Sequence, residues 1–385
     1  MKELSAVLAG VAACLVAEAS AQEPDWANMP YTRHSDFQAV DANGNGTFNL
    51  AAGPVKTRAI ILNRSCDFLN GSANAVAPPL GAQWQLWAQA VDLNDAAWDD
   101  DDFGGTALFM GKNYGSLPWI NDPSRSYTAE EWASEMERLN HDPVSGRRFR
   151  PGDLVEVRAR GPGLFFRGKT NVNEEHSKAE EQNFDVYLIE AAHGLPAPSL
   201  VTLADLKDAS DEFIFDPARQ IGPEHYQSAL VQINGVSFVD AAAWGPGGSL
   251  VIQDGSGRTF PVRLGRGRCF STRGAPIGPF DIVGILDQED ANGNDGYKHG
   301  YRLMVFGYDG TRFFVPTTPG DADFDEDVDL ADFSTLQACF NGPNRPPVQP
   351  DCDDLDFDFD GDVDLADFAV FQGCFNGPNR PAVCG

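Results

Sequence analysis

The chain has 385 residues, of which 42% are hydrophobic and 11% aromatic, and a formal net charge of −29. A chain of this length and apolar content can bury the cores of two or three domains. A charge this negative disfavours generic nucleic-acid binding, which depends on Lys and Arg side chains at the phosphates, although it leaves room for a local basic patch.

The N-terminus has the features of an export signal. An apolar run covers residues 6–17, and Ala19-Ser20-Ala21 forms a small-x-small cleavage site that would leave a mature chain beginning at Gln22. The run is too short to span a bilayer. A lipoprotein box ending at Cys14 is the alternative, but the apolar run continues past it. We therefore expect residues 1–21 to be a signal peptide and the protein to be secreted or displayed at the cell surface.

After a polar, aromatic segment at 22–53, short strand-like runs dominate the chain. They alternate or are rich in β-branched and aromatic residues, and Gly, Pro, Asn and Asp clusters bound them. The runs are 56–62, 83–91, 105–110, 153–158, 163–169 and 184–190. One helical pattern lies between the third and fourth runs, at 129–139, where Thr128 and Glu131 predict a capping box. This order is typical of a five-stranded Greek-key barrel, which we expect over residues 54–205.

The next part of the chain repeats this order after a Pro-containing crossover at 195–206. Its predicted strands are 228–238, 249–253, 259–264, 281–286 and 301–306. The succession SALVQINGVSF, LVIQDGSGRTFPVRL and FDIVGIL resembles the tandem OB-fold modules of secreted bacterial nucleases and cell-surface proteins. The resemblance implies a second OB-like barrel at 206–316 and a binding or scaffold role without catalysis.

The last part of the chain, 317–385, contains one acidic loop pattern twice, 35 residues apart. Aspartates occupy positions 1, 3, 5, 7, 9 and 12 of each twelve-residue loop, where oxygen ligands can converge on Ca²⁺ and position 7 offers its backbone carbonyl. The predicted ligands are Asp321, Asp323, Asp325, Asp327, Asp329 and Asp332, and Asp356, Asp358, Asp360, Asp362, Asp364 and Asp367. Residues 323–346 match residues 358–381 at 19 of 24 positions. A disordered acidic tail, the alternative, would lack this register and the interleaved aromatics.

Each loop leads into a short helical pattern with an apolar face. The faces are Phe333, Leu336 and Phe340 in one copy and Phe368, Phe371 and Phe375 in the other. Two such faces can bury each other.

This pair of loop-helix segments resembles a type I dockerin, with Asp at position 12 and Val at position 8. The resemblance implies an EF-hand-like α-helical module, two Ca²⁺ sites and a cohesin-like or other protein partner. Two features depart from the family. Glu326 stands where the second loop has the turn-forming Gly361, and Leu330-Ala331 with Leu365-Ala366 occupy positions that are usually polar for cohesin recognition.

Six cysteines follow the predicted signal peptide, and an even count in an exported protein indicates disulfides. Four of them, Cys339, Cys352, Cys374 and Cys384, lie in the duplicated region and allow three pairings. The repeat favours two local pairs, Cys339 with Cys352 and Cys374 with Cys384. Cys66 and Cys269, from different predicted barrels, would be the remaining pair.

No catalytic motif is present in the sequence. The six histidines are scattered, and no metal-binding pair, nucleophile elbow or phosphate-binding glycine loop occurs. The acidic run 99–102 fits a solvated loop better than a glycosidase site. Candidate sugar-stacking residues are Trp84, Trp87, Trp98, Trp119, Trp132 and Trp244, with a core role as the alternative.

An OB barrel normally binds ligands on its second and third strands, here 83–91 with 105–110 and 249–253 with 259–264. The second pair carries the densest basic cluster in the chain, and an anionic polymer would bind there unless these arginines only balance nearby acids. The cluster consists of Arg258, Arg263, Arg266 and Arg268. The sequence thus predicts a mainly β, non-catalytic adaptor protein. The alternative is an enzyme or a carbohydrate-binding component of extracellular polysaccharide breakdown.

Overall fold

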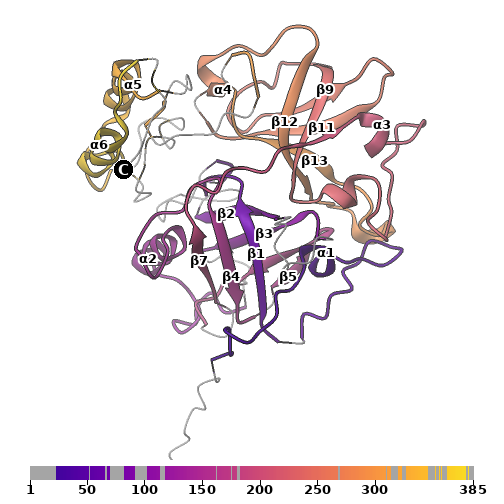
Figure 1. Cartoon of the computed structure of the whole chain (residues 1–385), viewed down its shortest axis with the longest axis horizontal. Coiled ribbons are helices and arrows are strands. Elements are labelled where there is room, and N and C mark those ends of the chain that lie inside the picture. Colours follow the sequence, from indigo (N-terminus) through magenta and orange to yellow (C-terminus); the bar gives the residue numbers. More distant parts are fainter. Residues whose placement is uncertain are drawn as a thin grey trace, which may run out of the picture.

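The computed structural model describes residues 23–51, 53–65, 67–69, 82–91, 102–112, 118–161, 163–174, 176–179, 183–267, 269–308, 310–313, 320–322, 327–345, 352, 355, 357, 362–378 and 380. Over these ranges the protein is mainly β, with two sheets, one closed five-stranded barrel and a few helices (Figure 1). The predicted signal peptide lies outside the described residues, as do Cys66, Cys384 and Arg268.

The first sheet has seven strands in the order β5-β6-β3-β2-β1-β4-β7. Only the β3–β6 pairing is parallel. The strands are β1 (Val55–Ile61), β2 (Gln83–Ala90), β3 (Gly105–Gly111), β4 (Leu154–Ala159), β5 (Leu164–Phe166), β6 (Lys169–Asn173) and β7 (Phe184–Glu190). Their alternation places one set of side chains in a core that includes Trp84, Leu108 and Val172.

Two helices complete this first core. Helix α2 (Ala129–Asn140) begins at the predicted capping box of Thr128 and Glu131 and buries Trp132. The one-turn helix α1 (His34–Phe37) lies in the N-terminal segment and buries Phe37 in the same core. The described part of the N-terminal segment therefore contributes to the packing of the first sheet.

The predicted single strand at 163–169 is wrong. The chain reverses at Arg167 and Gly168, which have φ values of +51° and +103°, and forms the β5–β6 hairpin with Phe166 opposite Lys169. Positive φ at both turn residues gives the twist that a two-residue hairpin needs. A Cβ added at Gly168 would lie 2.4 Å from the side chain of Gln288, so this turn also packs against the second sheet.

The second sheet contains the closed barrel, in which each strand pairs with two others in the cycle β9-β10-β11-β13-β12-β9. Only the β11–β13 contact in this cycle is parallel. The strands are β8 (Ser199–Val201), β9 (Leu230–Phe238), β10 (Ser249–Gln253), β11 (Thr259–Leu264), β12 (Phe280–Gln288) and β13 (Tyr301–Val305). The shorter elements are α3 (Leu203–Leu206), η2 (Pro223–Tyr226), α4 (Cys269–Thr272) and η3 (Gly293–Asp295). Strand β8 pairs in parallel with β9, and its Val201 lies in the barrel core.

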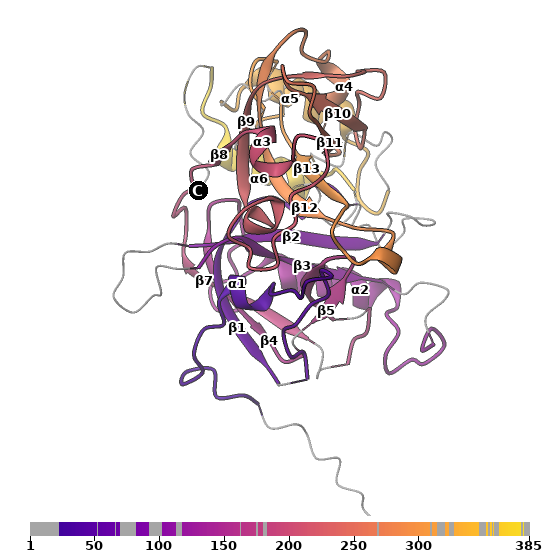
Figure 2. The same cartoon turned by 90° about the vertical axis from the view of Figure 1, so that its right-hand side faces the viewer.

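The two sheets share a continuous interface (Figure 2). Its apolar part contains Leu62 and Trp87 from the first half of the chain and Leu230, Ile285 and other residues from the second. Beside it, the backbone N–H of Leu230 donates to Gln89 Oε1 over 2.9 Å. The two sheets are therefore packed against each other and not joined only by a linker.

The C-terminal repeats form two helices that lie side by side in Figure 1, α5 (Leu330–Cys339) and α6 (Leu365–Cys374). Leu336 and Phe371 are buried between them, and Phe333 packs against Phe368 with ring centroids 5.8 Å apart. The predicted apolar faces are too long by one residue each. Phe340 and Phe375 follow the last helical residues and are 43% and 45% exposed.

Candidate functional site

Each C-terminal repeat gathers three carboxylates at the start of its helix. Asp327, Asp329 and Asp332 each place a carboxylate oxygen within 4.8 Å of the other two, and Asp362, Asp364 and Asp367 repeat this arrangement. These residues occupy loop positions 7, 9 and 12. The position 7 residue therefore brings its side chain into the group, whereas the loop pattern had predicted only its backbone carbonyl.

Hydrogen bonds hold the position 12 carboxylates in place. Asp332 is fully buried and accepts from the backbone N–H of Ala322 over 2.6 Å and of Asp329 over 2.7 Å. Asp367 accepts from Phe357 and Asp364 in the same way. Each position 12 residue thus ties the first half of its loop to the N-terminus of the helix.

The chemistry of these groups fits a hard divalent cation. All the gathered donors are carboxylate oxygens, which Ca²⁺ prefers over nitrogen or sulfur. At an effective dielectric constant of 20, two such charges less than 5 Å apart repel each other by about 3 kcal/mol. A cation would relieve that repulsion. Of the other predicted ligands, Asp321 is buried, and Asp323, Asp325, Asp356, Asp358 and Asp360 lie outside the described residues.

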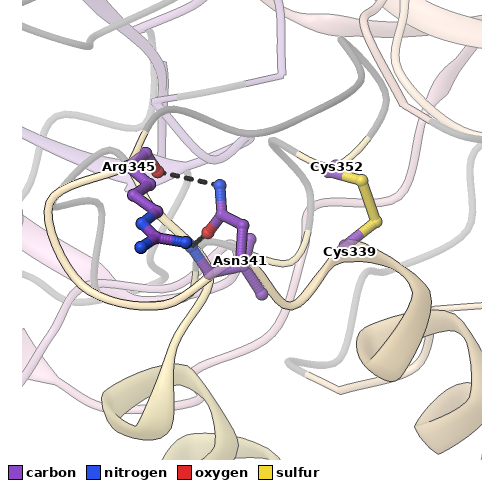
Figure 3. Close-up of a disulfide and its surroundings, with 5 residues drawn as sticks. Cys339, Asn341, Arg345 and Cys352 are labelled. Atoms are coloured by element: carbon purple, nitrogen blue, oxygen red, sulfur yellow. Dashed lines mark hydrogen bonds between the residues drawn. A yellow bond between two sulfur atoms is a disulfide. The ribbon is translucent and has the colours of Figure 1, made fainter.

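The two repeats are joined by reciprocal backbone contacts at the position 8 valines. Val363 O accepts from the N–H of Asn341 over 3.0 Å, and Val328 O accepts from the N–H of Asn376, also over 3.0 Å. Asn341 Oδ1 also accepts from Val363 N, and its Nδ2 donates to Arg345 O (Figure 3). The Asn-Gly sequence after each helix is therefore hydrogen-bonded to the loop of the other repeat.

A disulfide fixes the end of α5. Cys339 and Cys352 are bonded with a Cα–Cα distance of 5.4 Å, which is one of the two local pairs expected from the repeat (Figure 3). Cys374 is disulfide-bonded as well, and its expected partner Cys384 lies outside the described residues. Cys269 is buried in the core of the closed barrel.

Two members of the predicted arginine cluster lie at opposite ends of β11. Arg258 lies at the tip of the β10–β11 hairpin and donates to Lys207 O and Asp208 O, whereas Arg263 lies near the other end of β11 and donates to Ser249 Oγ. Five residues of strand separate the two by roughly 17 Å. The backbone N–H of Arg266 donates to Asp67 O at the contact with the first half of the chain.

The two predicted ligand faces meet across one cleft of about 810 Å³. Strands β2, β3 and β6 line one wall, and β10 and β11 line much of the other. The polar lining side chains are Gln83, Gln85, Lys169, Asn171, Asn173, His176, Ser249, Arg263, Glu289 and Arg302. Strand β6 was not predicted, so the sequence reasoning missed its contribution. The alternation of Gln83 and Gln85 with buried Trp84 and Leu86 was the available signal for the β2 wall.

The cleft is bordered by an ion network between the sheets. Asp287 is fully buried and pairs with Lys169 and with Arg302, whose Nη2 lies 2.8 Å from its carboxylate. Glu289 binds Arg302 and Arg167. Burial alone would raise the pKa of Asp287, but the charges of Lys169 and Arg302 outweigh burial and hold that pKa below its usual value.

Other candidate residues have structural roles. Trp84, Trp87 and Trp132 are fully buried, so they cannot stack on a sugar, and Trp98 lies outside the described residues. Asp102, the last residue of the acidic run, accepts from the backbone N–H groups of His34 and Ser35. His34 is itself buried, with its ring nitrogens at hydrogen-bonding distance from Thr106 Oγ1 and Arg58 O.

Comparison with known proteins adds no family assignment. Neither a scan against protein-family models nor a search of curated proteins found a match to this chain. Within the described residues, no helix is both long and apolar enough to cross a membrane.

Proposed function

We propose that this protein is an exported, non-catalytic adaptor whose C-terminal module, which resembles a type I dockerin, binds two Ca²⁺ ions and attaches the chain to a protein partner. The observation that carries the proposal is the same three-carboxylate group at equivalent positions in both repeats. Duplicated hydrogen bonding to both position 12 residues supports it, because a solvated acidic tail would not bury them.

Calcium binding would stabilise the folded module as well as relieve the repulsion between the carboxylates. A cation that binds the folded loops and not the unfolded chain stabilises the folded module. Because the capping aspartates Asp329 and Asp364 also begin α5 and α6, binding at the loops would order the helices. The partner would then recognise a surface that exists only in the calcium-bound state.

Two equivalent leucines support a protein partner for this module. Leu330 and Leu365, at loop position 10, are each 71% exposed in the first turn of their helices. A single exposed leucine is ordinary, but the same leucine at the same position of both repeats offers a partner two equivalent apolar contacts. A protein partner with an apolar docking surface would cover one or both of them.

The closed barrel supports the OB-like interpretation of the middle region. Its five strands pair in the sequence order first, second, third, fifth, fourth and back to first, with the third and fifth parallel. In the first sheet, β1, β2, β3 and β6 follow the same order, and β4 returns to β1. This connectivity suits a rigid binding scaffold.

Calorimetry on the whole chain tests the proposal. We expect titration with CaCl₂ to show two sites, and the Asp332→Ala/Asp367→Ala variant to lose both. A panel of purified cohesin domains, measured by surface plasmon resonance with calcium and with EGTA, tests the partner. Binding that is unchanged in EGTA, or in a Leu330→Ser/Leu365→Ser variant, would contradict a calcium-dependent leucine surface.

A further inference from the structure

The wall of the cleft formed by β2, β3 and β6 carries side-chain amides around an aromatic ring. Gln85 on β2 stands opposite Phe109 on β3, and Phe109 is in register with Asn173 on β6. Gln83 and Asn171 lie two residues away on the same face. All five side chains line the cleft. Each amide offers both donors and an acceptor, which matches the hydroxyl groups of a sugar.

Asn171, one of these amides, has an unsatisfied hydrogen-bond acceptor in the described part of the protein. The residue is only 5% exposed, and among the described residues its Oδ1 has no hydrogen-bond partner. A buried amide oxygen without a partner costs free energy. Because this oxygen is shielded from solvent, it would gain a partner from the cleft only when the Asn171 side chain turns toward it, and a ligand hydroxyl there would favour that turn.

The opposite wall supplies a positive charge. Arg263 donates to Ser249 Oγ over 2.8 Å, and in the described part of the chain it forms no ion pair. Burial lowers the pKa of Arg263, and the neighbouring Arg302 lowers it further, against the attraction of Glu289. A ligand anion beside Arg263 would therefore relieve an unfavourable environment, and a carboxylate fits the forked geometry of its guanidinium.

The remaining charges leave the surroundings of the cleft positive. Arg167, Lys169 and Arg302 face Asp287 and Glu289 in the ion network, so three positive charges meet two negative ones before Arg263 is added. This local excess stands out in a chain with a net charge of −29. The shared apolar interface holds both walls in a fixed relation, which reduces the entropic cost of binding.

We propose that this cleft binds a segment of an acidic oligosaccharide, with Arg263 on a uronate carboxylate, the amides on hydroxyl groups and Phe109 against the apolar face of a ring. A single-stranded nucleic acid fits less well, because such ligands need a track of basic residues along the backbone. A peptide that adds as a strand also fits less well, since β2, β3, β6, β10 and β11 are already paired on both sides.

Binding of defined oligosaccharides by the full chain tests this inference. The probes are glucuronate-containing oligosaccharides, each paired with its methyl-esterified form, and the readout is the Kd from calorimetry. We expect the acidic form to bind at least about 10-fold more tightly than its ester, the gain of a charge-assisted hydrogen bond. Arg263→Gln should remove this preference, whereas Asn171→Ala should weaken both forms.

Arg258→Gln is the matched control, because Arg258 lies on the same hairpin but outside the cleft. It should bind both probes as the unmodified chain does. Equal affinity for acid and ester, an equal effect of the two arginine variants, or no binding at millimolar probe would overturn the inference, and so would tighter binding of oligodeoxythymidylate. The inference does not rest on the calcium module. The Kd for the acidic oligosaccharide should be the same with and without EDTA. A failure of this inference can therefore be distinguished from a failure of the calcium proposal.

Discussion

Replacing Asp287 by Asn tests whether the ion network holds the two sheets together. Asp287 is fully buried, and Lys169 is only 4% exposed, so the substitution leaves an ammonium group in the interface with a neutral amide in place of its counterion. Breaking a buried pair in this way costs about 3–5 kcal/mol. For a unit of this size, that loss lowers the melting temperature by roughly 6–20 °C.

Two comparisons separate this cost from the general effect of mutation. Glu131→Gln removes the charge partner of Lys178 in a surface pair, whose side chains are 44% and 22% exposed, and keeps an oxygen that can accept at the capping box, so it should lower the melting temperature much less. The Lys169→Met/Asp287→Asn double variant removes both charges and should be more stable than Asp287→Asn alone. Differential scanning calorimetry measures all three. A double variant no more stable than the single one would refute the reasoning.

The same network predicts a pH dependence. The pKa of Asp287 is lower in the folded chain than in the unfolded one. Its ionised carboxylate therefore stabilises the folded state fully above the ordinary Asp pKa of about 3.9. This stabilisation is lost as the pH falls through the lowered pKa of the folded state, because below it Asp287 is protonated in both the folded and the unfolded chain. The stability gap between the unmodified chain and Asp287→Asn should therefore be constant near neutral pH and narrow in acid.

Calcium should protect α5 and α6 in hydrogen-exchange mass spectrometry of the whole chain, and equal exchange in calcium and chelator would contradict the calcium proposal. Asp367→Ala should weaken calcium binding more than Asp332→Ala, because only the second loop has glycine at position 6; calorimetry that ranks them the other way would reject this. Cys339→Ser opens a disulfide with a sequence separation of 13 and should cost about 3 kcal/mol, measured by chemical denaturation under non-reducing conditions. Gly168→Ala should cost more than 1 kcal/mol in the same assay, because its φ is +103° and its Cβ position is occupied; an unchanged midpoint would count against that geometry.

Local patterns predicted the elements whose determinants lie close together in the sequence. The capping box before α2 and the strands of the closed barrel follow from residues within each segment. The β5–β6 hairpin was missed because Arg167, and not Asn or Gly, occupies its first turn position with positive φ. The three-residue strand β8 has too few residues for a pattern and exists only through its pairing with β9.

The candidate sites, too, could be predicted only where their residues lie close together in the sequence. Loop spacing predicted the acidic groups at the C-terminus, since all three members of each group lie within six residues. The cleft depends on how two sheets pack, and no local pattern shows that Gln85 and Arg263 line the same cavity. The arginines seemed to be one cluster because they are close in sequence, but a strand moves Arg258 and Arg263 to opposite ends.

The packing of the N-terminal segment determines which recombinant fragments of this protein should stay soluble. A fragment that began at residue 54 would lack Phe37, a fully buried part of the first core, and the contact between Ser35 O and Arg219 of the second half. One that ended at residue 205 would expose Trp87 to water. Exposed aromatic surface of this kind promotes aggregation. A fragment from residue 23 to residue 313 keeps all these contacts, and either half expressed alone should be recovered mainly as aggregate.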